Sequence, residues 1–223
     1  MSLDRTQTFF HQYANDFDAI YGNQNGLIDS VINKLFRKSM WLRYEKSIEG
    51  CNPIEGKTVL DIGCGPGHYS ITLAQRGAAK VTGIDFAEGM LKLATEHAQK
   101  VGVGDRCQFQ VADFYQYPPE QTFDYVIVMG FMDYMPDAEK VVARVLSLTR
   151  NKAFFSFPAA GGILAWQRKL RYQKRCDLFL YTEPQLKQIF SHFPEATATI
   201  EPIARDFFVT LTRKEKAPRT ATA

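Results

Sequence analysis

The stretch Val59-Leu60-Asp61-Ile62-Gly63-Cys64-Gly65-Pro66-Gly67 is the most informative pattern in this chain. It leads from a hydrophobic strand into an acid and three alternating glycines, and a helical pattern follows. Glycines permit a tight turn and let the backbone approach a ligand closely, and the N-terminus of a helix presents free N–H groups. The dinucleotide fingerprint G-x-G-x-x-G would place its third glycine at position 68, where this chain has His68. The loop therefore predicts a ligand site with a spacing that disfavours a dinucleotide.

Short β-rich runs alternate with helical patterns from about residue 58 to residue 157. This order predicts a parallel sheet with helices on both faces. The expected strands and helices are, in order, strand 58–60, helix 69–76, strand 80–84, helix 87–101, strands 107–111 and 123–129, helix 138–148 and strand 153–157. The last two strands, 197–203 and 207–212, are joined by three residues, which is too short for a parallel crossover. We therefore expect an α/β, Rossmann-like, mostly parallel seven-stranded sheet with a C-terminal antiparallel hairpin.

Three further regions flank or interrupt this core. Residues 1–52 carry helical patterns over 9–21 and from 27 to about 50, and predict an N-terminal helical arm that forms a lid. The core then covers residues 53–213, with a lid-like insertion at about 160–182. Within it, 161–181 has a basic helical pattern, and 183–193 predicts another helix. Residues 214–223 are expected to be a disordered tail.

Composition limits the classes of function. The chain has 223 residues and a net charge of +3, which is mild for a protein that binds nucleic acid. Its four cysteines are scattered without a CxxC pair, which indicates neither zinc nor disulfides and favours a reducing compartment. No signal-peptide pattern opens the chain, so we expect a cytoplasmic protein. The basic run 168–175 and the basic residues of the second helix are either a solvated face or a contact with an acidic membrane.

The pattern D-x-G-x-G-x-G resembles motif I of the class I S-adenosylmethionine-dependent methyltransferases. In that family the loop contacts the methionine part of the cofactor. The resemblance thus implies S-adenosyl-L-methionine as cofactor and S-adenosyl-L-homocysteine as product, with contacts from Asp61, Gly63, Cys64, Gly65 and Gly67. A glycine turn that serves the fold alone is the alternative.

The second strand of this pattern ends at Asp85, about 20 residues after the loop. A carboxylate there can accept hydrogen bonds from both ribose hydroxyls, and the alternative role is an N-cap for the helix from residue 87. In the family, the residue matched by Phe86 flanks the adenine, and Met90 is expected to pack nearby.

The third and fourth strands complete the cofactor site that the resemblance implies. Ala112, Asp113 and Phe114 follow the third strand and match the loop that holds the adenine amino group, although Asp113 could also be a simple turn residue. Met129 and Gly130 end the fourth strand, where the reactive sulfonium is expected, because ligands of such sheets bind outside the carboxyl ends of the strands.

The nature of the methyl acceptor follows less directly. The segment after residue 129 lacks the [DNS]-P-P-[YF] motif of nucleobase amino-methyltransferases and the cysteine of RNA cytosine enzymes, and no metal site is indicated. Segments 18–22, 154–158 and 207–209 resemble magnesium-protoporphyrin O-methyltransferases, with ubiquinone-biosynthesis enzymes as relatives. In that family a tyrosine matched by Tyr21 and a histidine after the fourth strand line the active site. This chain has Tyr134 in place of that histidine and Gly130 where the family tends to have an aspartate.

The sequence thus predicts transfer of a methyl group to an O, N or C atom of a small molecule by in-line displacement. Macromolecular methyltransferases of RNA or protein, a non-catalytic cofactor-binding module and a dinucleotide oxidoreductase stay open as alternatives. The protein is expected to be a monomer or a homodimer. The residues expected at the acceptor are Tyr21 and Tyr134 as catalytic groups, and Tyr13, Tyr21, Phe131 and Tyr134 as the substrate-facing or lid residues.

Overall fold

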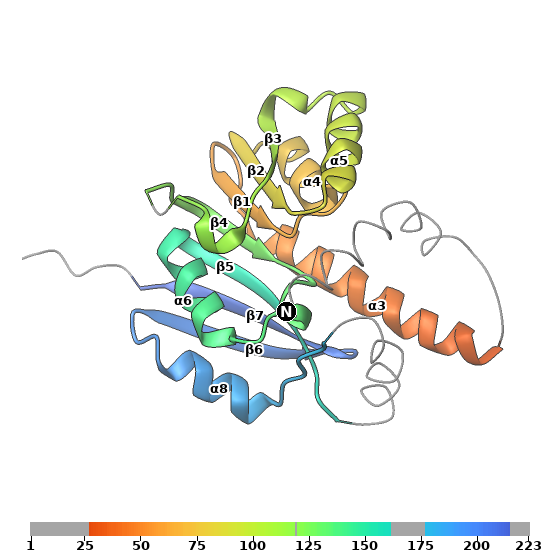
Figure 1. Ribbon diagram of the computed structural model, residues 1–223, viewed down its shortest axis with the longest axis vertical. Helices are drawn as coiled ribbons and strands as arrows, with labels where there is room; N and C mark the ends of the chain where they lie inside the picture. Colours follow the sequence, from red (N-terminus) through yellow and green to blue (C-terminus); the bar gives the residue numbers. More distant parts are fainter. Residues whose placement is uncertain (1–26, 119, 162–176, 215–223) are drawn as a thin grey trace, which may run out of the picture.

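The computed structural model describes residues 27–118, 120–161 and 177–214, and these contain one seven-stranded sheet in the order β3-β2-β1-β4-β5-β7-β6 (Figure 1). The first five strands of this order run parallel, and β7 pairs antiparallel with both β5 and β6. The predicted mostly parallel sheet with an antiparallel hairpin is therefore confirmed. The strands are β1 (Thr58–Ile62), β2 (Lys80–Asp85), β3 (Cys107–Val111), β4 (Phe123–Val128), β5 (Thr149–Pro158), β6 (Ala196–Ile203) and β7 (Asp206–Arg213).

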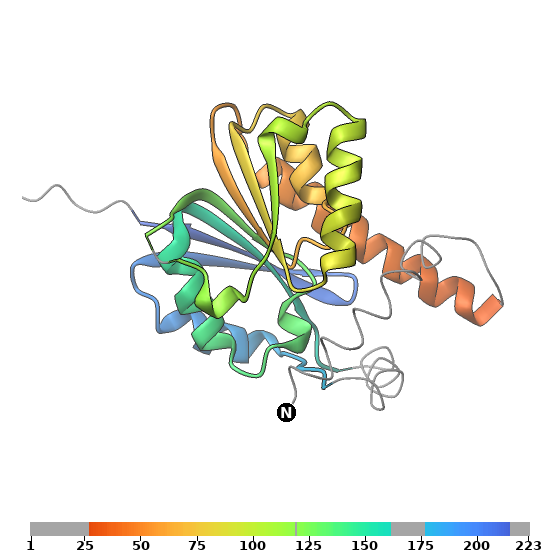
Figure 2. The same cartoon turned by 45° about the horizontal axis from the view of Figure 1, so that its top comes forward.

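The helices form two layers on opposite faces of the sheet (Figures 1 and 2). One layer holds α3 (Leu27–Gly50), α4 (His68–Gln75) and α5 (Glu88–Lys100), and the other holds α6 (Ala138–Leu148) and α8 (Glu183–Ser191). Successive residues of a strand point to opposite faces, so Val59 packs in the core under the first layer and Leu60 in the core under the second. Because both faces are covered, the central strands are continuous hydrophobic runs.

Three short 3₁₀ helices were not expected from the sequence. They are η1 (Gly104–Arg106), η2 (Phe114–Gln116) and η3 (Met132–Tyr134). Two of them follow the carboxyl ends of β3 and β4, which is where the ligand site is predicted. The segments after these strands are therefore ordered turns with internal hydrogen bonds.

The prediction of a helix over 161–181 is wrong for residues 177–181. Residues 177–180 have no regular structure, and Tyr181 forms a parallel bridge with Ala159. The Tyr181 N–H donates to Pro158 O at 2.9 Å, and its ring packs edge-on against Phe157 at 5.0 Å between centroids. Pairing with the end of β5 and burial of the ring outweigh the helical pattern there. Residues 162–176 lie outside the described part.

The other boundaries differ only slightly from those predicted. Strand β5 begins at Thr149 instead of residue 153, and α8 ends at Ser191 because His192 is already its C-cap. A capping box between Thr182 and Gln185 starts α8. The arm predicted as a lid covers residues 1–52, of which 27–50 form α3. Its residues 1–26, like 215–223 of the predicted tail, lie outside the described residues.

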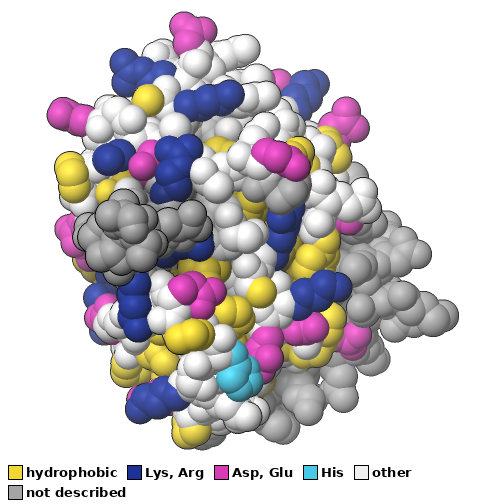
Figure 3. Space-filling view, turned by 90° about the vertical axis from the view of Figure 1, so that its left-hand side faces the viewer, with side chains coloured by type: hydrophobic (Ala, Val, Ile, Leu, Met, Phe, Trp, Pro, Cys, Tyr) yellow, Lys and Arg dark blue, Asp and Glu magenta, His cyan; other side chains and the backbone are white. Residues whose placement is uncertain are grey.

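On the face shown in Figure 3, Lys and Arg side chains are interspersed with Asp and Glu side chains and with apolar ones, which agrees with the mild net charge. In the part of the chain that the structure describes, no helix combines the length and apolar character needed to cross a bilayer. The basic run 168–175 falls outside that part.

Candidate functional site

The glycine loop after β1 is a tight turn built on left-handed backbone. Gly63, Gly65 and Gly67 have φ angles of 69°, 50° and 81°, which other residues adopt only at a cost of about 1–2 kcal/mol. The N–H groups of Gly63 and Cys64 both donate to Ile84 O, at 2.8 and 3.1 Å. These bonds fix the loop to the end of β2. The alternating glycines are thus required by the backbone itself.

The three glycines face different surroundings. A Cβ at Gly67 would lie 3.0 Å from Ala94 Cβ, and one at Gly63 would lie 3.1 Å from Phe131 Cδ2. A Cβ at Gly65 would meet no atom within 4 Å. Gly67 therefore permits close packing on α5, whereas Gly65 leaves its backbone open to a ligand.

Cys64 contributes backbone rather than a side chain to this loop. Its thiol is buried, and a Cβ at Gly83 would lie 2.8 Å from its Sγ, so Gly83 is the glycine that makes room for it. Burial raises the pKa of the Cys64 thiol well above its ordinary value, with smaller contributions from Asp61 and Asp85. A ligand contact from Cys64 would accordingly use main-chain atoms.

Asp61 holds the loop to the helix that follows. Its carboxylate is buried and accepts a hydrogen bond of 2.7 Å from Ser70 Oγ. Burial raises the pKa of Asp61 to about 7, and hydrogen bonds from the Ser70 hydroxyl and backbone work in the opposite direction. Because Ser70 belongs to the first turn of α4, this contact sets the direction of the helix N-terminus. Ser70 was not singled out in the sequence, although an acceptor such as Asp61 needs a donor in that turn.

Asp85 joins the end of β2 to the glycine loop. Its Oδ2 accepts the Gly65 N–H and its Oδ1 accepts the Ala87 N–H, both at 2.9 Å. The two N–H groups therefore fix the orientation of the Asp85 carboxylate. Phe86 is half-buried, whereas Met90 is buried on α5 and belongs to the core.

The loop after β3 is tied to the same place. The Ala112 N–H donates to Asp85 O at 3.2 Å. Asp113 is exposed and caps η2, where Oδ1 accepts the Tyr115 N–H at 2.9 Å and Oδ2 accepts Gln116 Nε2 at 3.1 Å. Asp113 thus has the turn role that the sequence left open. Phe114 is buried.

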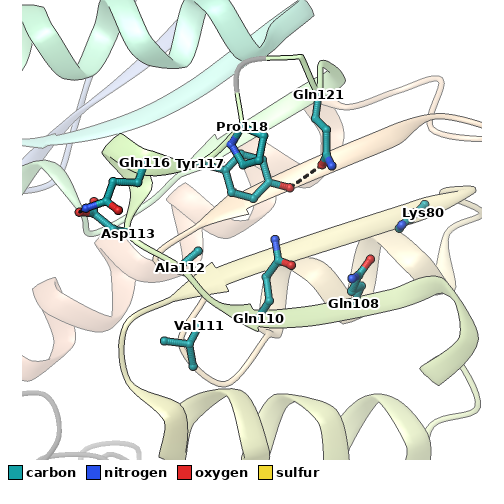
Figure 4. Close-up of a pocket in the computed structure, with 10 residues that line it drawn as sticks. All are labelled: Lys80, Gln108, Gln110, Val111, Ala112, Asp113, Gln116, Tyr117, Pro118 and Gln121. Atoms are coloured by element: carbon teal, nitrogen blue, oxygen red, sulfur yellow. Dashed lines mark hydrogen bonds between the residues drawn. The ribbon is translucent and has the colours of Figure 1, made fainter.

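A polar cavity of about 370 Å³ lies beside this loop, on the side of the edge strand β3. In Figure 4, Gln108 and Gln110 extend from β3 toward it, and Tyr117 donates a hydrogen bond of 2.8 Å to Gln121. Of the predicted cofactor residues, only Ala112 and Asp113 line it. The cavity therefore borders the predicted adenine end and is separate from the glycine loop.

The end of β4 lies next to the glycine loop, because β1 and β4 are neighbours and Asp61 is in register with Ile127. Met129 and Gly130 are half-buried, and Gly130 has a φ of 69° with open space where its Cβ would be. Phe131 packs between Gly63 and the ring of Phe114, at 5.5 Å between ring centroids. The strand ends thus bring Gly65, Asp85, Ala112 and Gly130 to one edge.

The predicted acceptor residues are only partly placed. Tyr134 is half-buried at the end of η3, and its N–H donates to Phe131 O at 3.2 Å. Tyr13 and Tyr21 lie outside the described residues. Within the described residues, no group of three or more His, Cys, Asp and Glu side chains could hold a metal ion.

One functional candidate was missed in the sequence. Ser156 on β5 is buried, and its Oγ accepts the Gly130 N–H at 2.8 Å. A lone serine within the apolar segment 154–158 gave no indication of such a contact. Its partner lies in another strand-end turn, 26 residues away in the sequence.

Known proteins with similar sequences are methyltransferases. Residues 54–174 match the family model described as a methyltransferase domain. The chain is 39% identical over 114 residues to a ubiquinone biosynthesis O-methyltransferase of Neisseria meningitidis, covering 49% of this chain and 47% of that protein. It is 29% identical over 154 residues to the enzyme of the same name from Coxiella burnetii, covering 68% and 59%. The matched region thus spans about half of these curated relatives.

Known structures with the same fold extend the comparison over nearly the whole chain. Magnesium protoporphyrin IX methyltransferase from Synechocystis PCC 6803, solved with bound S-adenosylhomocysteine, superposes with a TM-score of 0.72 at 21% identity and covers 93% of this chain and 100% of that one. The DhpI-SAM-HEP complex gives 0.68 at 16% identity, covering 95% and 97%. With the glycine loop, the strand order and the family match, the chain belongs to the methyltransferase domain family and has the Rossmann-like fold of its class I members.

Proposed function

We propose that this protein is an S-adenosylmethionine-dependent methyltransferase that transfers a methyl group to an oxygen of a small molecule. The observation that carries the proposal is the contact between Asp85 and Gly65, which fixes a carboxylate beside open backbone at the end of β2. The O-methyltransferase names of the curated relatives support an oxygen acceptor. Nitrogen and carbon atoms of a small molecule are the alternative acceptors.

The described residues fit the cofactor. The open backbone at Gly65 gives room for its methionine part, the Asp85 oxygens can accept hydrogen bonds from the ribose hydroxyls, and Phe86 and the segment 112–114 flank the place for adenine. When bound, S-adenosyl-L-methionine supplies an activated methyl group on a sulfonium. The residues of this chain would align the acceptor with that group and exclude water.

Methylation of a hydroxyl requires that its proton leave. Tyr134 lies on the turn after β4, next to Phe131 in that turn, and is the described candidate for binding or deprotonating the acceptor. Tyr13 and Tyr21 of the N-terminal arm are further candidates, with Tyr21 proposed as the second catalytic group. We propose a small-molecule acceptor. For a lipid-soluble acceptor, we also propose that the basic helices contact an acidic membrane.

The cofactor is tested by measuring the affinity of the full chain for S-adenosylhomocysteine and for NAD by calorimetry. We expect S-adenosylhomocysteine to bind and NAD not to bind. Asp85→Ala should weaken the binding of S-adenosylhomocysteine by about 10- to 100-fold, because hydrogen bonds to a charged group are worth about 1.5–3 kcal/mol. Asp105→Ala removes an exposed aspartate of η1 and should change nothing. Equal affinities of the two variants, or binding of NAD alone, would contradict the cofactor assignment.

The acceptor class is tested with methyl-labelled S-adenosylmethionine. The label should pass to small hydroxylated aromatic compounds and stay out of tRNA and protein. Label that accumulated in RNA or protein would instead support a macromolecular acceptor. Cofactor binding without transfer to any of these would support a non-catalytic binding module.

A further inference from the structure

A buried polar network crosses the interior beneath the end of β4. Ser39, Arg43 and Ser47 are spaced by four residues on α3, so they share one face of the helix, and all three are buried. Opposite this face lie Asp206 at the start of β7 and Ser156 on β5, which are also buried. The network therefore places a charged pair inside a region where the neighbouring side chains are apolar.

The contacts of this network connect α3 with the turn after β4. Ser39 Oγ donates to Asp206 Oδ2, and Arg43 Nε lies 3.7 Å from the same oxygen. Arg43 Nη1 donates to Ser156 Oγ at 3.3 Å. Ser156 Oγ in turn accepts the Gly130 N–H at 2.8 Å. The guanidinium is thus linked through one hydroxyl to the backbone of the turn after β4.

Stability alone is a weak explanation of such an arrangement. A buried ion pair loses much hydration energy, and replacing one with apolar residues is often neutral or stabilising. The Arg43 Nε, moreover, has no hydrogen-bond acceptor among the described residues. What the network does provide is a fixed position for Ser156 Oγ, because that atom accepts from two directions.

Gly130 is the residue through which a fixed Ser156 side chain affects the turn after β4. Strand β4 ends at Val128, so the Gly130 N–H lies past the strand, and the Ser156 side chain is its acceptor. The adjoining Phe131 packs on Gly63 of the glycine loop. The turn that Ser156 holds is therefore one wall of the proposed methyl-transfer site.

We propose that Arg43 and Ser156 are positioning residues that hold the Gly130 turn in place for methyl transfer. The inference rests on the proposed function for its chemical meaning. It also links α3 to the site, since a movement of this helix would reach Gly130 through a single hydroxyl. Neither side chain needs to touch the cofactor or the acceptor for this role.

The position of Gly130 can be followed directly. The dipeptide Met-Gly occurs once in the sequence, at Met129-Gly130. In the full chain labelled with ¹³C-carbonyl methionine and ¹⁵N-glycine, a carbonyl-to-amide correlation spectrum therefore contains one signal, from the Gly130 amide. Ser156→Ala should move the amide proton upfield because its hydrogen bond is lost. Arg43→Met should move the same signal although Arg43 does not contact Gly130.

Two variants make this comparison decisive. Tyr44→Phe removes a hydrogen bond of 2.6 Å between the same helix and Thr72 of α4, and should leave the Gly130 signal in place. Arg43→Lys keeps a charge opposite Asp206 but lacks the Nη1 that donates to Ser156, so it should shift the signal even if Arg43→Met does not fold. An unmoved signal in Arg43→Lys, or an equal shift in Tyr44→Phe, would overturn the proposal.

A binding measurement connects the shift to the site. The transferable methyl group is the difference between S-adenosylmethionine and S-adenosylhomocysteine, so a displaced Gly130 turn should affect the first ligand more. We expect Ser156→Ala to weaken the binding of S-adenosylmethionine about threefold more than that of S-adenosylhomocysteine, a difference of about 0.6 kcal/mol. Tyr44→Phe should preserve the ratio of the two affinities. An unchanged ratio in Ser156→Ala would refute the positioning role. Failure of the wild-type chain to bind either ligand would instead refute the proposed function, and the Gly130 signal would still test the link to Arg43.

Discussion

The Gly65 N–H donates a hydrogen bond of 2.9 Å to Asp85 Oδ2, so the loop after β1 and the acid that ends β2 form one unit. The second oxygen of Asp85 holds the Ala87 N–H at the start of the next segment. A ligand that bonds to this carboxylate therefore meets a group whose orientation is already fixed. Little conformational entropy remains to be lost at Asp85 when the ligand binds.

Alanine at Gly65 separates the backbone role of this glycine from its role at the site. Gly65→Ala and Gly56→Ala both place a side chain at positive φ, 50° and 71°, in otherwise open space. Each should lower the free energy of unfolding by about 1–2 kcal/mol. Only Gly65→Ala should weaken the binding of S-adenosylhomocysteine, by about tenfold, or about 1.4 kcal/mol. Urea denaturation and calorimetry measure the two effects, and equal affinities in both variants would place the ligand elsewhere.

The buried Asp61 predicts an unusual dependence of stability on pH. Its pKa is raised from 3.8 to about 7 by burial, so between these values the folded chain keeps a proton that the unfolded chain has lost. The free energy of unfolding should therefore fall as the pH rises from about 4 to about 7. Relative to Asp61→Asn, the wild type should lose about 2–3 kcal/mol between pH 5 and pH 8, at about 1.4 kcal/mol for each pH unit. Urea denaturation of both proteins at these two pH values measures the difference.

Asp124 provides the control for this measurement. Burial works to raise its pKa, but hydrogen bonds from Thr58 and the charges of Lys57 and Arg150 outweigh burial and lower it. Both the folded and the unfolded chain carry this charge from pH 5 to pH 8, so the cost of Asp124→Asn should be the same at both values. A wild type that gained stability over Asp61→Asn toward pH 8 would show that Asp61 is ionised in the folded chain.

The last residue of α3 should tolerate no side chain. A Cβ at Gly50 would lie 2.5 Å from Cε1 and 2.8 Å from Cζ of the buried Phe154. Gly50→Ala should lower the free energy of unfolding by about 1–3 kcal/mol, because overpacking displaces the ring. Phe154→Leu replaces the ring with a smaller side chain. In that background Gly50→Ala should lower the free energy of unfolding by less, so the two effects should not add. Additive effects in urea denaturation of the two single variants and the double variant would contradict this contact.

The local features of the fold could be predicted from the sequence. The glycine loop needs positive φ at positions that glycine marks, and the strands are hydrophobic runs of suitable length, so both depend on neighbouring residues. The short link between the last two strands likewise defined the hairpin. The loop after β3 was predicted with two roles for Asp113, and the structure shows the capping role while leaving adenine contact as a proposal.

The long-range features could not be predicted in this way. The partners Ser39 and Asp206 are 167 residues apart, and Arg43 and Ser156 are 113 residues apart. Nothing in the local pattern of a basic helix distinguishes a buried arginine from the exposed ones around it. The segment 177–181 was misassigned for a related reason, since Tyr181 forms an isolated bridge with Ala159, which lies just past the end of β5 and far from it in the sequence.

The strand order β5-β7-β6 also has a consequence for synthesis on the ribosome. Strand β5 is complete at residue 158, but its outer neighbour β7 ends only at residue 213. Until then the nascent chain exposes the edge of a mostly hydrophobic strand, and such edges promote aggregation. Arg43 lacks its carboxylate partner over the same interval, because Asp206 is the first residue of β7. Chains released before this point should therefore need chaperones, and premature termination within the final 20 or so described residues should yield insoluble protein.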